Sequence, residues 1–185
     1  MDRQASSVVS AAGPRVVVEV LALRLTACGH LAYRLEAVGL GGDAPDAAAL
    51  RAAGVTAATA AAGTVSHSTS WRYTGDGAVV LTYALTPDPA VDLPAQILAP
   101  GGVVCSPRPL HPSPGDVHAH HVAAHAVRHL AHLAATDPTV AVAAARHPEL
   151  WRELVRYGRR VVVATPGGHG LTYEQALRRD RERQS

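Results

Sequence analysis

The sequence predicts a single α/β domain, with a mixed or antiparallel sheet built from two hairpins and a C-terminal helical layer. Residues 15–37 and 64–86 each contain two apolar, alternating runs around a glycine turn, which is typical of hairpins. After residue 116 the apolar residues recur every three or four positions, which indicates helices. A chain of 185 residues is long enough for one sizeable core and short for two.

The composition narrows the classes of function. The 17 basic residues are all arginine, and a formal charge of +2 is too weak and scattered to predict nucleic-acid binding. No run approaches the ~20 apolar residues of a membrane span, and the first residues lack the apolar core of a signal peptide. We therefore expect a cytoplasmic protein in which the isolated Cys28 and Cys105 are free thiols. Nothing in the sequence fixes an oligomeric state.

The first hairpin follows a lead-in, residues 1–14, that we expect to be flexible. A three-residue loop of Cys28, Gly29 and His30 would pair Leu25 with Tyr33 and place the large apolar side chains on one face. A short helix is expected next, with Asp46 as its N-cap and Gly54 after its end.

In the second hairpin we expect Tyr73 to pair with Ala78, which predicts strands in the middle of a sheet covered on both sides. Regular alternation would place His67 and Trp71 on one side and Arg72 on the other, with Ser66, Ser68 and Ser70.

Residues 87–115 read as a proline- and glycine-rich loop, with a short helix or strand expected near 96–98 or 103–105. One helix should then cover 116–136, with Asp116 as its cap. A second helix should begin after Asp137, and a third should run from Pro148 to Gly158. The domain is thus expected over residues 15–158. We expect residues 159–185 to form a tail with a strand and a short helix.

Five histidines give the helix at 116–136 its functional interest. At 100° per residue they fall within roughly 80° of one another, on the border between the apolar face and solvent: His118, His121, His125, His129 and His132. The stripe is ~21 Å long, whereas zinc lies about 2.0–2.1 Å from its nitrogen ligands, so one ion can use two of these rings and rarely three.

Three kinds of function remain open for this stripe. His125, Arg128 and His129, with His67 opposite, would bind a small anionic ligand such as a nucleotide or phosphate. Alternatively, His121, His125 and His129 would ligate zinc or another divalent transition metal, completed by His67, His111 or Asp92. No HExxH glutamate is present, so the helix would supply metal ligands but no built-in general base, and bound water would be the nucleophile of a metal-dependent hydrolase. The third is an interaction protein whose helix docks a partner. Besides these functions, the histidines could be purely structural, lying at the solvent border with hydrogen bonds to loop carbonyls.

The element order resembles a contracted Nudix-type domain over residues 15–136: a long hairpin, a GG turn, a helix ending in AGV, and the strands HSTSWRY and VVLTYAL. The resemblance implies an α/β/α sandwich and, in active members, magnesium-dependent hydrolysis of nucleoside diphosphate derivatives. The Nudix box needs several glutamates, but residues 43–53 offer only Asp43, Asp46 and Arg51, so standard Nudix catalysis is not expected. The HSTSWR and HAVRHL segments are also similar to those of uncharacterised proteins of GC-rich bacteria.

Overall fold

Strand β1 (Val16–Leu25) lies at the centre of a five-stranded sheet with the order β3-β4-β1-β2-β5. It pairs antiparallel with β2 (Leu31–Gly39) and parallel with β4 (Val79–Thr86), so the sheet is mixed, as predicted. The outer strands are β3 (Val65–Tyr73) and β5 (Gln96–Ile97). This computed structural model describes residues 15–104, 117–164 and 171–172, and the predicted tail helix lies outside them.

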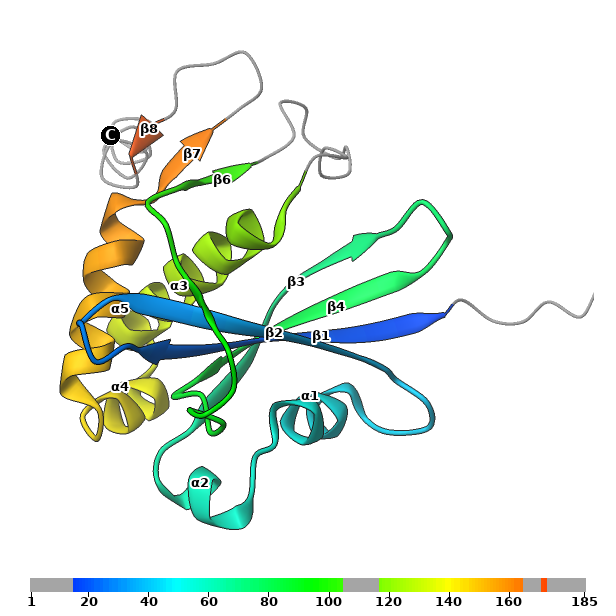
Figure 1. The fold of residues 1–185 in the computed structure, drawn as a ribbon, viewed down its shortest axis with the longest axis horizontal. Helices are drawn as coiled ribbons and strands as arrows, with labels where there is room; N and C mark the ends of the chain where they lie inside the picture. Colours follow the sequence, from blue (N-terminus) through cyan, green and yellow to red (C-terminus); the bar gives the residue numbers. More distant parts are fainter. Residues whose placement is uncertain (1–14, 105–116, 165–170, 173–185) are drawn as a thin grey trace, which may run out of the picture.

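Helices cover both faces of this sheet (Figure 1). One face packs against α1 (Pro45–Ala53), which is followed by the short α2 (Ala57–Ala61). The other face packs against α3 (Ala119–Thr136), α4 (Pro138–Ala144) and α5 (Pro148–Arg160). A second, three-stranded sheet contains β6 (Gly102–Val104), β7 (Val162–Ala164) and β8 (Leu171–Thr172). The α/β fold predicted from the sequence is therefore present.

Side-chain alternation along β1 explains the two layers. Leu21 and Leu23 point into the core beneath α3 and α5, whereas Val18, Val20 and Ala22 point toward α1. All five are fully buried. Residues buried on both faces of a strand are typical of a sheet interior, and each fully buried valine or leucine contributes about 1.5–3 kcal/mol through burial.

Both hairpin registers differ from the prediction. Leu25 pairs with Leu31 rather than Tyr33, and Tyr73 pairs with Val79 rather than Ala78. In each hairpin the loop has three residues and ends in a glycine with positive φ, 78° at Gly29 and 80° at Gly77. A three-residue hairpin loop needs the left-handed conformation at its third position, which fixes where the glycine must stand.

The helix boundaries follow the predicted signals with three corrections. Gly54 ends α1 at φ 80°, and Pro138 and Pro148 occupy the first turns of α4 and α5. However, Ala44 rather than Asp46 is the N-cap of α1, and His118 is the N-cap of α3, while Asp116 lies outside the described residues. Helix α5 also continues past Gly158, because this glycine is buried at the crossing with α3 instead of ending the helix.

The second hairpin was predicted to lie in the middle of the sheet, but only one of its two strands does. β4 is buried between β1 and β3, but β3 forms the edge of the sheet. Its aromatic residues Trp71 and Tyr73 are 63% and 66% exposed, and their rings meet edge to face at 5.5 Å. The predicted cover on both sides is therefore wrong for the outer half of this hairpin.

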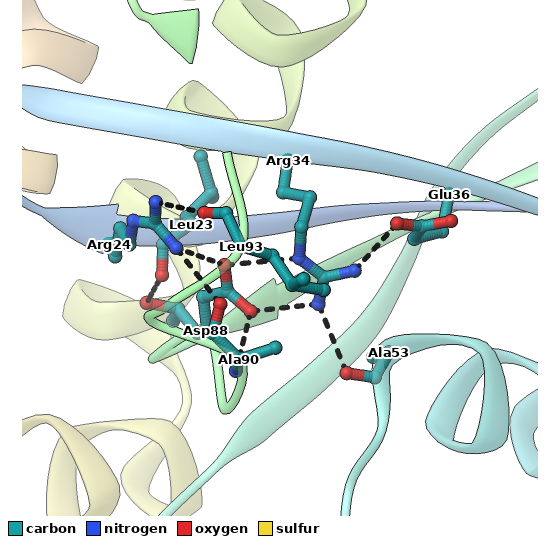
Figure 2. Close-up of polar contacts among 9 residues, drawn as sticks. Leu23, Arg24, Arg34, Glu36, Ala53, Asp88, Ala90 and Leu93 are labelled. Carbon is teal, nitrogen blue, oxygen red and sulfur yellow. Dashed lines mark hydrogen bonds and ion pairs between the residues drawn. The ribbon is translucent and has the colours of Figure 1, made fainter. Parts of the chain in front are cut away.

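A buried cluster of ion pairs closes the α1 side of the sheet (Figure 2). Asp88, which follows β4, accepts hydrogen bonds from Arg24 at 3.1 Å and from Arg34 at 2.9 and 3.3 Å. Arg34 also donates to Glu36 and to the backbone carbonyl of Ala53 at the end of α1. Two arginines and two carboxylates neutralise one another, so this cluster joins β1, β2, α1 and the segment after β4.

Candidate functional site

The candidate site begins with an irregularity in β3. Ser68 pairs with Tyr83 and Ser70 pairs with Thr82, so Thr69 is one extra residue in β3. Such a bulge reverses the side-chain alternation beyond it. Before the bulge, His67 pairs with Ala84, which belongs to the core beneath α3. After the bulge, Ser70 and Arg72 lie on that same face. The prediction that they point away from His67 is therefore wrong.

Helix α3 meets the bulge through His125. The Nε2 atom of this half-buried side chain lies 3.2 Å from the backbone oxygen of Thr69. A carbonyl oxygen only accepts hydrogen bonds, so the ring donates from Nε2 and keeps its lone pair on Nδ1. Burial lowers the pKa of His125, and the nearby charge of Arg128 lowers it further, against the opposite effect of the Thr69 carbonyl. His125 is thereby favoured as a neutral imidazole.

His67 and His129 form the second contact between the sheet and α3. Their ring centroids are 5.0 Å apart and their planes are inclined at 50°. His67 Nδ1 lies 2.8 Å from the backbone oxygen of Ser68, so this nitrogen carries the hydrogen and Nε2 carries the lone pair. His129 Nε2 is buried and has no hydrogen-bond partner among the described residues. Burial, followed by the charges of His67, His125 and His132, lowers the pKa of His129.

Arg128 and His121 occupy different parts of α3. Arg128 is half-buried, and its charge is close enough to lower the pKa of His125, which places it at the same edge as the histidine contacts. His121 lies near the start of the helix. Its Nδ1 accepts a hydrogen bond from the backbone of His118 at 3.2 Å, and its ring centroid is 4.0 Å from that of His120. The structure thus brings together His67, His125 and His129, with Arg128 beside them.

No group of three or more His, Cys, Asp or Glu side chains within the described ranges is arranged to hold a metal ion. A zinc site on His121, His125 and His129 therefore stays a prediction based on helical spacing. Of the proposed additional ligands, Asp92 is exposed in the loop between β4 and β5, and His111 lies outside the described residues.

A charged group on the same face of the sheet was missed by sequence reasoning. Glu19 on β1 is only 8% exposed and accepts two hydrogen bonds from Arg72, at 2.9 and 2.7 Å. Thr82 donates a third to the carboxylate at 3.1 Å. These bonds raise the pKa of Arg72 despite its partial burial. The sequence signal was Glu19 itself, which is the one carboxylate in a ten-residue strand that is apolar apart from Glu19 and one arginine. A carboxylate buried in such a strand requires a cation as its partner.

The histidines and Arg128 at this edge supply hydrogen-bond donors, hydrogen-bond acceptors and titratable groups. Among the described residues, no nucleophile is paired with a base there. No protein-family model, no curated protein and no solved structure matches this chain. The Nudix resemblance therefore stays a prediction. None of the helices in the described ranges combines the length and apolar character needed to span a bilayer.

Proposed function

We propose that this protein binds a small anionic ligand, nucleotide or phosphate-like, at the edge formed by His67, His125, Arg128 and His129. The observation that carries the proposal is the buried His129 Nε2, which has no partner among the described residues and adjoins the ring of His67. A buried polar nitrogen without a partner is costly, and a ligand that accepts or shares its hydrogen removes that cost.

Electrostatics favour an anion over a neutral ligand. Burial lowers the pKa of both half-buried histidines, and nearby positive charge lowers it further: that of Arg128 at His125, and that of the neighbouring histidines, when they are protonated, at His129. An anion bound among these groups would counter that repulsion and raise both pKa values. Binding is therefore expected to take up protons and to strengthen as the pH falls. A metal ion would behave in the opposite way, because metal ligation requires neutral imidazoles and releases protons.

The test is calorimetric titration with inorganic phosphate and with a nucleoside diphosphate between pH 6 and pH 8. Affinity should fall with rising pH by as much as about tenfold per pH unit for each proton taken up. His129→Gln should reduce this dependence, and Arg128→Gln should weaken binding by about tenfold or more, the size expected for a charge-assisted hydrogen bond.

The matched control is Arg152→Gln, which removes the same charge from the exposed part of α5. It should leave the affinity within about twofold, because exposed charges at a distance are screened by salt. Affinity that is independent of pH, or equal losses in the Arg128 and Arg152 variants, would overturn the proposal.

We place this function in the cytoplasm, as the sequence leads us to expect.

A further inference from the structure

A pocket separate from the histidine contacts lies between the β1–β2 turn, the segment after β5 and the C-terminal half of α5. Figure 1 shows the β1–β2 turn beside α5. The pocket has a volume of about 430 Å³, within the range of about 300–1,000 Å³ that is typical of small-molecule sites. It shares no lining residue with the proposed anion site, so its occupancy can be judged independently.

The pocket walls are mainly apolar. Leu31, Leu98 and Val161 are buried, whereas the side chain of Ile97 is 61% exposed. The Tyr157 hydroxyl donates a hydrogen bond of 2.7 Å to the backbone oxygen of Ala99 and so ties the segment after β5 to α5. Burial raises the pKa of Tyr157 to about 12. The phenol therefore keeps its hydrogen at physiological pH and donates it to the Ala99 carbonyl.

The charged groups of the pocket are two arginines on successive turns of α5, together with Glu153. Arg156 is already occupied, since its Nε donates to Glu153 at 2.6 Å. Arg160 is exposed, lines the pocket, and makes no hydrogen bond or ion pair to any residue within the described ranges. The pocket thus combines an apolar interior with the guanidinium of Arg160, which has no partner within the described ranges. The planar guanidinium can donate two parallel hydrogen bonds to a carboxylate.

We propose that this pocket binds an amphipathic organic acid, with its apolar body against Leu31, Ile97 and Leu98 and its carboxylate on Arg160. Burial of the apolar body would remove the exposed face of Ile97 from water and supply most of the affinity. The guanidinium selects the acid over a neutral molecule of the same shape.

Decanoate is the probe, and binding is followed by calorimetry and by ¹H–¹⁵N NMR of the full chain. The expected amide shifts lie at Gly29, Leu31, Leu98 and Gly101. Arg160→Gln should weaken binding by about tenfold or more, as expected when a hydrogen bond to a charged group is lost. Arg159→Gln is the matched control: it is adjacent on α5 and carries the same charge, but does not line this pocket. It should change the affinity less than about twofold.

Decanol should bind about tenfold more weakly than decanoate, and inorganic phosphate should leave the pocket amides unshifted. Equal affinities of the two glutamine variants, equal binding of decanol and decanoate, or shifts confined to the α3 histidines would overturn the proposal. Failure of phosphate to bind anywhere would contradict the anion site and leave this result intact, so the two proposals are tested separately.

Discussion

The imidazole rings of His67 and His129 meet at 5.0 Å, and this contact joins the edge strand of the sheet to the middle of α3. The contact joins residues 62 positions apart in sequence, so protonation of His129 would place a charge between the sheet and the helix. The histidine pair therefore links the protonation state of the candidate site to the stability of the fold.

This link predicts a loss of stability in mild acid. The folded chain holds the pKa of His125 and of His129 below the ordinary value, which is about 6.5 and applies to the unfolded chain. The unfolded state then binds more protons as the pH drops through that value, so the free energy of unfolding decreases until the folded pKa values are passed. Urea denaturation at steps from pH 7.5 to pH 5 measures the slope.

The variant His125→Gln/His129→Gln should flatten this slope, and His30→Gln, at an exposed position, should keep it. A wild-type slope of the same size in the double variant would show that other groups are responsible. Stability that rises as the pH falls would contradict the direction of both pKa shifts.

Removing the central carboxylate of the buried ion-pair cluster should destabilise the fold strongly. Asp88→Asn leaves Arg24 and Arg34 facing each other without their shared anion, and the Arg34 side chain is only 6% exposed. Breaking a buried pair in this way costs about 3–5 kcal/mol. Denaturant unfolding measures the loss. Asp43→Asn, whose partner Arg51 is 53% exposed, is the control and should cost no more than about 1 kcal/mol.

The bidentate pair of Glu19 and Arg72 should show a clear coupling energy. Their side chains are 10% and 29% exposed, so solvent screens the pair incompletely. A double-mutant cycle with Glu19→Gln and Arg72→Gln is expected to give about 1–3 kcal/mol. The exposed pair Glu153 and Arg156, three residues apart on α5, should give about 0.5 kcal/mol or less in the same measurement. Similar values for the two pairs would show that solvent screens the Glu19–Arg72 pair as fully as the exposed one.

The crossing of α3 and α5 should not tolerate a methyl group at Gly158. A Cβ there would lie 2.8 Å from the Cβ of Ala131 and 3.4 Å from the Cα of Arg128. Gly158→Ala is therefore expected to lower the melting temperature, with a cost of about 1–3 kcal/mol from overpacking. Ala131→Gly in the same chain should restore part of the loss, although glycine within a helix costs about 1 kcal/mol itself.

Gly42→Ala is the control for that experiment, because a Cβ there meets no atom within 4 Å. It should leave the melting temperature nearly unchanged. If Gly158→Ala behaved like this control, the two helices would have to be packed less closely than the structure shows.

Local signals accounted for the elements that the sequence predicted correctly. Proline at the first turns of α4 and α5 and glycine after α1 mark helix ends through their own backbone chemistry. The register of both hairpins would also have followed from one local rule, namely that Gly29 and Gly77 must take the third, left-handed position of a three-residue loop.

The rest depended on contacts between distant residues. Nothing local shows that Thr69 is an extra residue, because the bulge is defined by its partners Tyr83 and Thr82 on β4. Asp88 was likewise hidden in a proline-rich segment. Placing Arg24 and Arg34 on one face of the first hairpin could have revealed it, since like charges on one face need a shared anion. The convergence of His67, His125 and His129 depends on where α3 packs across β3, and no local sequence pattern gives that position.

The extra residue at Thr69 decides which side chains of β3 face the helices. Deleting Thr69 would give uniform alternation and keep His67 and Arg72 on the same face, because Ser68 and Ser70 already pair with adjacent residues of β4. Inserting a further residue between His67 and Arg72, without a second bulge, would instead carry Arg72 to the opposite surface. Homologous chains are therefore expected to accept the loss of the bulged residue more readily than a further insertion in β3.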